Sequence, residues 1–171
     1  MNYEAMVKQC AEKHGDIWKY MLQTGDVQQE LEYVKWKEEQ GDTPEYMYEY
    51  AICRIDRVAD YLICPANIKV GDGVTVNLWS DRHAATVIKV TPCTVTVQYD
   101  KATLSPDFKP EWIPGGFAGH CVNQDEQTYT YERNPNGRIE KYHWSNKYGS
   151  YGTPGNLSLS KGRHEFYDYN F

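Results

Sequence analysis

The chain is 171 residues long, with 40% hydrophobic residues and a formal net charge of −6 at pH 7. This length corresponds to one domain, or to one domain with a substantial extension. The hydrophobic share is enough to form a buried core, so a wholly disordered chain is excluded. The 15 tyrosines and 5 tryptophans are a high aromatic content, which is typical of binding surfaces and also of β-strands.

The negative charge is concentrated in the first third of the chain. Residues 1–64 contain 13 acidic and 7 basic residues, whereas residues 65–171 contain 11 of each. Binding to duplex DNA through its phosphates requires the opposite balance, so general duplex DNA binding is disfavoured. An acidic helical surface suits a basic partner protein. A simpler explanation is that the acidic excess keeps the protein in solution.

The five cysteines are widely spaced along the chain and include no Cys-x-x-Cys pair. No cysteine or histidine cluster has the spacing of a zinc site, so we expect no metal and no cofactor. The N-terminus lacks a basic region followed by an apolar run, and no stretch approaches membrane-spanning length. These features predict a protein of the reducing cytoplasm, with no membrane partner.

Residues 1–64 have the pattern of a helical region. Helices are expected over 3–14, which Gly15 would end, over 17–23, over 26–40, and after Pro44. Asp26 and Gln29 resemble a capping box at the start of the third helix. Thr43 before Pro44 is a typical cap for the fourth helix.

The fourth helix has two stripes at helical spacing. One is apolar and is expected to be buried, with Met47, Ala51, Ile55, Val58 and Leu62. The opposite stripe contains Tyr46, Tyr50, Arg57 and Tyr61. This tyrosine stripe is a candidate surface for self-association, in a homo-oligomer, or for a partner.

Residues 65–171 have a β pattern, and Pro65 cannot continue the preceding helix. Within residues 71–100, three short runs of alternating apolar residues are separated by turns, which indicates an antiparallel meander. The sequence therefore predicts an α+β protein. A helical region, 1–64, is expected to pack on an antiparallel β domain, 65–171, that forms a small SH3-like barrel or a strongly bent sheet.

The remaining β pattern lies on both sides of an irregular segment. Residues 101–121 are rich in proline and glycine and predict a long connection with little regular structure. A second hairpin is expected from 128–133 and 138–144, with its turn at 134–137. Two short β segments, 157–160 and 165–169, would end the chain.

No group of residues forms a strong catalytic motif. Asp81 could orient His83 for general-base chemistry, but no nucleophile is tied to the pair. His120 and Cys121 are neighbours, and adjacent strand residues point to opposite faces. The glycine-rich stretch 114–119 lacks the lysine of a phosphate-binding loop. We therefore expect no catalytic residues, although an enzyme that uses His83 or His120 with a nearby carboxylate is one alternative.

The candidate binding residues form two groups. The first is the tip of the first hairpin: Trp79, Asp81, Arg82 and His83. The second group interleaves cations with aromatic residues around the second hairpin: Tyr129, Tyr131, Arg133, Arg138, Lys141, Tyr142, Trp144 and Tyr148. Such interleaving is typical of surfaces for single-stranded nucleic acid or nucleotides. An ordinary strand surface with cross-strand pairs is the simpler explanation.

Several phrases of the sequence resemble a known group of proteins. They are GDGVTVNLWSDRHAATVIKV, KATLSPDFKPEWIPGGFAGHC, QTYTYER and GRHEFYDYNF, within residues 68–171. Together they resemble a mostly uncharacterised family encoded by phages and mobile elements of gut anaerobes. Some relatives are suspected to be anti-CRISPR proteins against type II-A (Cas9) systems. The resemblance implies a non-enzymatic inhibitor in the host cytoplasm, and it assigns no functional residues.

The leading hypothesis is a phage-encoded, non-enzymatic Cas9 inhibitor that binds a host defence complex, with the Cas9–guide RNA effector as the suspected partner. A small acidic protein without a catalytic set could act in this way through surface complementarity alone. The main alternative is a small-ligand or nucleotide-binding module that sequesters a signal in defence. A further alternative is a phage accessory or assembly protein that oligomerises.

Overall fold

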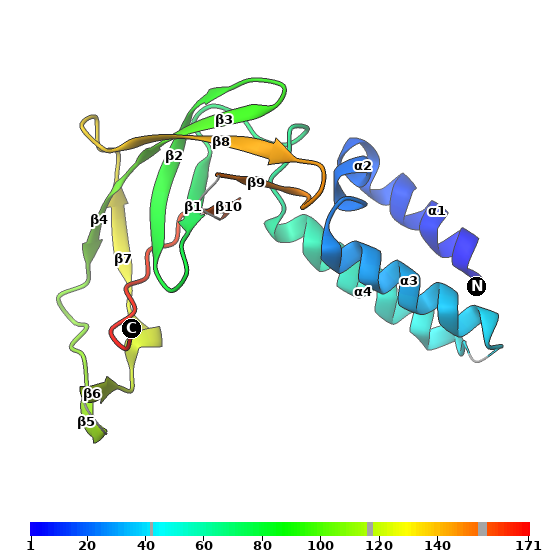
Figure 1. Ribbon diagram of the computed structural model, residues 1–171, viewed down its shortest axis with the longest axis horizontal. Helices are drawn as coiled ribbons and strands as arrows, with labels where there is room; N and C mark the ends of the chain where they lie inside the picture. The colour runs from blue at the N-terminus through cyan, green and yellow to red at the C-terminus, as the bar shows by residue number, and fades with distance from the viewer. Residues whose placement is uncertain (42, 116–117, 154–156) are drawn as a thin grey trace. The chain divides into compact units, whose positions relative to one another are not determined.

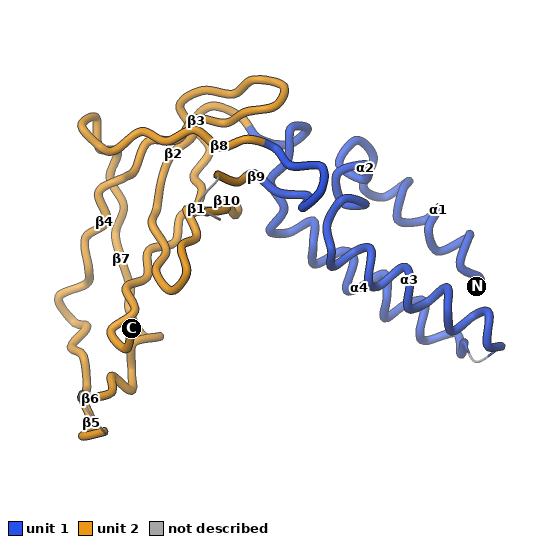
Figure 2. Tube along the Cα trace, in the orientation of Figure 1, with its two compact units in different colours: residues 1–68, 144–151 blue, residues 69–143, 152–171 orange. Residues whose placement is uncertain are grey.

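The computed structural model describes residues 1–41, 43–115, 118–153 and 157–171. Helices occupy the N-terminal part, and a closed antiparallel barrel with two small sheets occupies the C-terminal part, which confirms the α+β class (Figure 1). The chain divides into two compact units. The helical unit comprises residues 1–68 and 144–151, and the β unit comprises residues 69–143 and 152–171 (Figure 2). The boundary between the two units thus lies after residue 68, and residues 144–151 also belong to the helical unit.

The helical unit contains helices α1 (Tyr3–His14), α2 (Trp18–Met21), α3 (Gly25–Glu39) and α4 (Glu45–Tyr61), with a 3₁₀ turn, η1 (Gly15–Ile17), after α1. Its core is a cluster of fully buried side chains from all four helices, including Met6, Met21, Val27 and Ile55. The expected capping box is wrong. The side chain of Thr24 caps α3 by accepting a hydrogen bond from the Val27 amide, and Asp26 lies inside the first turn.

The apolar stripe of α4 is buried as the sequence predicts, with one change at its start. Ala51, Ile55 and Val58 are buried, but Tyr48 takes the position expected for Met47. The Tyr48 hydroxyl donates a hydrogen bond of 2.7 Å to Glu38. The hydroxyl of this buried ring therefore has a hydrogen-bond partner, Glu38, at the edge of the helical core.

Residues 144–151 group with the helices because they contact the connection between α2 and α3. The Trp144 indole nitrogen donates a 3.0 Å hydrogen bond to Gln23, and its ring meets the edge of Tyr20. Gly149 has φ +58°, and a Cβ at this position would lie 2.5 Å from the backbone carbonyl carbon of Gln23. Only glycine permits both this left-handed conformation and the close approach.

The β unit is built on a six-stranded closed barrel. Its strands are β1 (Gly73–Asn77), β2 (Arg82–Val90), β3 (Thr94–Tyr99), β8 (Ile139–Ser145), β9 (Ser150–Gly152) and β10 (Ser158–Lys161), in the order β1-β10-β9-β8-β3-β2. The antiparallel pairs β1–β2 and β2–β3 confirm the predicted meander. Alternate side chains of these strands, such as Val76, Val87 and Val97, are fully buried, which is the pattern of a filled small barrel.

The predicted second hairpin is wrong in its pairing. β7 (Tyr129–Glu132) pairs with β4 (Lys101–Leu104), whereas β8 pairs with β3 in the barrel. The turn itself forms, with a 2.9 Å hydrogen bond from Gly137 to Asn134. A Cβ at Gly137 would lie 2.0 Å from the carbonyl oxygen of Tyr99. The chain therefore passes closely over the end of β3 and continues beside it.

The segment 101–121 also contains more regular structure than the sequence indicates. Besides β4, it forms β5 (Trp112–Gly115) and β6 (Ala118–Cys121), which pair with each other, and η2 (Gln124–Glu126) follows. Residues 116 and 117 lie outside the described residues. Of the two predicted final segments, the first is β10, and the second makes a single bridge between Phe166 and Arg82.

Candidate binding surfaces

The predicted residues at the tip of the first hairpin have different environments. The Trp79 ring is 86% exposed. Asp81 accepts a 2.8 Å hydrogen bond from the Asp168 backbone, and Arg82 lies over the Phe166 ring. The C-terminal segment, residues 165–171, thus contacts the tip directly through Phe166 and Asp168. Trp79 remains exposed to solvent.

The C-terminal segment also contacts His83, through Glu165. The Nδ1 atom of His83 lies 2.9 Å from Glu165, whose second carboxylate oxygen accepts a hydrogen bond from the Ala84 amide. The contact with Glu165 raises the pKa of His83, against the opposing effect of burial. An enzyme hypothesis needs a histidine within reach of an acid, and this pair meets that condition. Among the described residues, however, no serine or cysteine side chain hydrogen-bonds His83, and Glu165 already binds the backbone.

A second hydrogen-bonded group lies beside His83 on β3 and β8. The hydroxyls of Tyr99 and Tyr142 both donate to Glu140, at 2.7 and 2.6 Å, and Arg138 pairs with the same carboxylate. Burial opposes ionisation of Glu140, but these two hydroxyls and Arg138 hold its pKa below the usual value. Burial and the bond to Glu140 raise the pKa of Tyr99 to about 12. Tyr142 is fully buried, so its ring belongs to the core.

Asp100 is a buried carboxylate that contacts Thr86 of β2. The Asp100 side chain is 1% exposed, and it contacts Arg163 at 2.7 Å and Arg133 at 3.9 Å. The Thr86 hydroxyl donates to it at 2.8 Å. Because Arg133 and Arg138 both face carboxylates of the fold, these two predicted binding cations have internal partners.

The other residues of the second predicted group are dispersed. Tyr129 donates to Gln127, and Tyr131 accepts from the Glu165 amide; both lie on β7. Lys141 is exposed on β8. Trp144 and Tyr148 belong to the helical unit, where Trp144 is partly buried and Tyr148 is 66% exposed. The group is therefore divided between two sheets and two compact units.

The helical unit carries aromatic and charged side chains along one side of α3 and α4, which we call the α3–α4 face. On α4 it contains Tyr46, Tyr50, Arg54, Arg57 and Tyr61, and on α3 it contains Asp26, Gln29, Glu30, Tyr33 and Trp36. Spacings of three and four residues place each set on one side of its helix. The exposed fractions are 67% for Tyr46, 62% for Tyr50 and 51% for Trp36. The tyrosine stripe of α4 is thus exposed, and α3 supplies a second half that the sequence reasoning missed.

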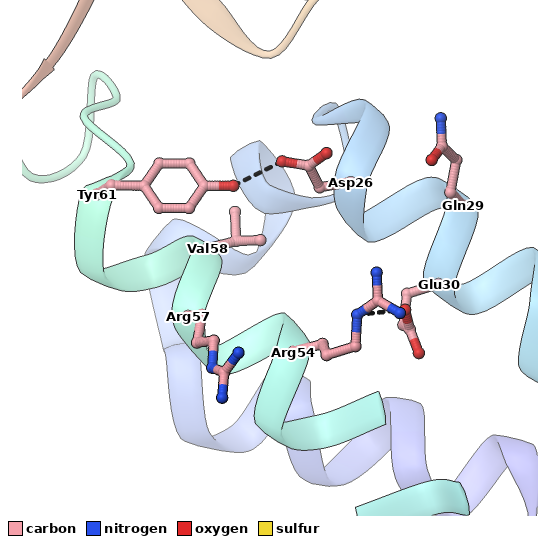
Figure 3. Close-up of a pocket in the computed structure, with 7 residues that line it drawn as sticks. All are labelled: Asp26, Gln29, Glu30, Arg54, Arg57, Val58 and Tyr61. Atoms are coloured by element: carbon pink, nitrogen blue, oxygen red, sulfur yellow. Dashed lines mark hydrogen bonds and ion pairs between the residues drawn. The ribbon is translucent and has the colours of Figure 1, made fainter. Parts of the chain in front are cut away.

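A pocket of about 180 Å³ lies on this face between the two helices (Figure 3). Two contacts cross it: Tyr61 donates a 2.6 Å hydrogen bond to Asp26, and Arg54 lies 3.1 Å from Glu30. Burial and the bond to Asp26 raise the pKa of Tyr61 to about 12. Arg57 also lines the pocket, and within the described residues it has no hydrogen bond or ion pair.

A metal-binding cluster and a membrane-spanning helix are two further features to consider in the described part of the chain. There, no group of three histidine, cysteine or acidic side chains could hold a metal ion. None of the described helices combines the length and apolar character that crossing a bilayer requires.

Comparisons with protein-family models, curated proteins and solved structures found no match to this chain. The resemblance to the phage-encoded family therefore stays a prediction from the sequence phrases. The class that the structure itself defines is an α+β protein with a small closed barrel and an exposed aromatic helical face.

Proposed function

We propose that the chain is a non-enzymatic binding protein and that the α3–α4 face is its docking surface. The observation that carries the proposal is the exposure of Tyr46, Tyr50 and Trp36 together on one helical hairpin. Tyrosine, tryptophan and arginine are the residues that most often dominate binding energy at protein interfaces. Rigid rings also lose little conformational entropy when a partner covers them.

The arginines of this face support the same proposal. Arg54 lies over the Tyr50 ring at 5.8 Å from its centre and contacts Glu30, while more than half of its side chain stays exposed. Arg57 has no partner among the described residues. A partner surface would bury Arg54 together with the Tyr50 ring, and such shared burial is typical of interface hot spots.

The partner that we propose is the one the sequence resemblance implies, a host defence complex of Cas9 with its guide RNA. The chain would act as a phage-encoded inhibitor by occupying the surface of this complex. The acidic balance of residues 1–64 supports association with a basic nucleoprotein, since opposite charges accelerate encounter.

The direct test is co-purification with Cas9 and guide RNA, together with an assay of DNA cleavage. We expect the wild-type chain to co-purify and to reduce cleavage, and Tyr50→Ala to weaken both effects. Tyr148→Ala is the matched control, because Tyr148 is an equally exposed tyrosine of the same unit outside the face. Undiminished cleavage and no co-purification would remove Cas9 as the partner. Loss of binding in Tyr148→Ala alone would remove the α3–α4 face.

The small-ligand or nucleotide-binding alternative is less well supported by the geometry. It rests on the aromatic and basic second predicted hairpin and on the long connection 101–121. Two of the hairpin cations, Arg133 and Arg138, contact Asp100 and Glu140. Calorimetry against a panel of cyclic nucleotides tests it directly. Saturable binding to any of them would favour this alternative over a protein partner.

A further inference from the structure

Two carboxylates lie one helical turn apart in the α3–α4 pocket. Asp26 and Glu30 are four residues apart on α3, so their side chains share one side of the helix. Asp26 uses only Oδ2 for its bond to Tyr61, and Glu30 uses only Oε2 for its contact with Arg54. One oxygen of each carboxylate therefore has no partner among the described residues.

Glu30 is the unusual member of the pair because its side chain is only 8% exposed. A buried carboxylate needs strong partners to offset the loss of hydration, and Glu30 has a single contact to the mostly exposed Arg54. Burial accordingly raises the pKa of Glu30, with Arg54 opposing the effect only in part. The pocket thus contains a mostly buried carboxylate that pairs with Arg54 through one oxygen and leaves the other oxygen open to the pocket.

The remaining walls suit an alkyl chain that ends in a cation. Val58 and the ring of Tyr61 line the pocket on α4. Long basic side chains pack their stems against apolar groups, and cations are attracted to tyrosine rings. The volume of about 180 Å³ is below the roughly 300–1,000 Å³ typical of small-molecule sites, so a single side chain is the better match.

We propose that this pocket receives a lysine or arginine side chain of the partner protein, with its cation held between Asp26 and Glu30. The proposal rests on the proposed function and adds the chemistry of the partner residue. The acidic balance of residues 1–64 supports it, because a basic segment is drawn towards this part of the chain.

Arg57 lines the same pocket and would favour an anion as its occupant. A change at Arg57 therefore distinguishes a cation from an anion most sharply. In Figure 3 its guanidinium points away from Asp26 and Glu30, so it supplies the partner of neither carboxylate. If the occupant is a cation, neutralising Arg57 removes a repulsion and binding stays equal or becomes tighter. If the occupant were an anion, Arg57 would be its main contact and the same change would abolish binding.

The experiment uses the full chain and a short peptide probe, acetyl-Ala-Arg-Ala-amide. Its neutral counterpart contains citrulline in place of arginine, which keeps the shape of the side chain and removes the charge. Backbone amide NMR signals are followed during titration. We expect saturable shifts at Asp26, Gln29 and Val58 with the arginine peptide and none with the citrulline peptide.

Variants then assign the contact to the two carboxylates. Glu30→Gln and Asp26→Asn should each weaken binding by about tenfold or more, because a charge-assisted hydrogen bond is lost. Glu32→Gln is the matched control, as it makes the same charge change at an exposed position of α3. Thermal unfolding of each variant verifies that the fold is retained. Asp26→Asn keeps the test valid if Glu30→Gln fails to fold.

Three results would overturn the proposal. They are equal shifts with the citrulline peptide, unchanged binding in both carboxylate variants, and loss of binding in Arg57→Gln. Because the probe is independent of any partner protein, failure here is distinct from failure of co-purification with Cas9. Saturable arginine binding without Cas9 binding would retain the pocket and remove only that partner.

Discussion

The α3–α4 face and the segment 138–145, which contains strand β8, have the same residue types, tyrosine and arginine, in opposite situations. In this segment, Tyr142 is fully buried on β8, and Arg138, just before β8, pairs with Glu140. On the α3–α4 face, Tyr50 is 62% exposed and Arg57 has no partner among the described residues. Interleaved aromatics and cations therefore indicate a binding surface only where the fold leaves them without internal partners.

The largest expected effect is at Tyr142, whose ring fills the barrel interior. Tyr142→Ala should destabilise the protein by about 3–5 kcal/mol, because it leaves a cavity in a closed barrel. Tyr142→Phe keeps the ring and loses only the hydrogen bond to Glu140, so a loss of about 1 kcal/mol is expected. Urea denaturation followed by fluorescence measures both. A loss below 1 kcal/mol for the alanine variant would contradict the core assignment.

The next largest effect is expected at Asp100, which contacts Thr86 of β2 and Arg163. Asp100→Ala leaves Arg163 and the Thr86 hydroxyl without their carboxylate partner. Removing one member of a buried ion pair costs about 3–5 kcal/mol, and the low end applies since Arg163 is 32% exposed and can regain water. Asp107→Ala is the exposed control and should change the unfolding free energy by less than about 0.5 kcal/mol. Equal effects in the two variants would show that Asp100 has no structural role.

The local patterns of the sequence were sufficient for part of this fold. The alternation in residues 71–100 predicts strands β1, β2 and β3, although β2 buries four consecutive residues, 84–87, and so both of its faces. The pairing of β7 with β4 was not predictable in this way, since strands separated by 24 residues leave no local signal of their register. The turn before β8 indicated a hairpin, although the close approach of Gly137 to Tyr99 directs β8 to β3.

The candidate site was also predictable only in part: sequence spacing indicates its α4 half, whereas its α3 half depends on tertiary packing. The spacing of Tyr46, Tyr50 and Tyr61 predicted one exposed stripe of α4. The α3 half was missed because Glu30 in an acidic helix has the pattern of a solvated charge. Its burial arises only when α4 packs against α3, and no local pattern contains that contact. The one available signal was the four-residue spacing of Asp26 and Glu30 together with Tyr33.

A pH-dependent effect is expected from His83. Glu165 raises the folded-state pKa of His83 above its ordinary value of 6.5, aided by the charge of Asp81 and opposed by burial and by Arg138. The protonated pair therefore contributes stability below pH 6.5 that is lost as the pH rises through the folded-state pKa.

The measurement compares the wild type with His83→Gln by urea denaturation between about pH 5.5 and pH 8.5. The difference in unfolding free energy should be largest at the acidic end and should decline towards the alkaline end. It should stay below about 1 kcal/mol, since His83 is partly exposed. A difference that grows with pH would reverse the sign and contradict the contact.

The smallest effect on stability is expected where the effect on binding is largest. Tyr50→Ala removes an exposed ring and its contact with Arg54, so the unfolding free energy should fall by only about 0.5 kcal/mol. Co-purification with the partner should nevertheless decrease by about tenfold or more, as for an aromatic hot spot. A large loss of stability would mean that Tyr50 holds the fold as Tyr142 does. The contrast between the two tyrosines would then no longer separate a binding surface from a structural one.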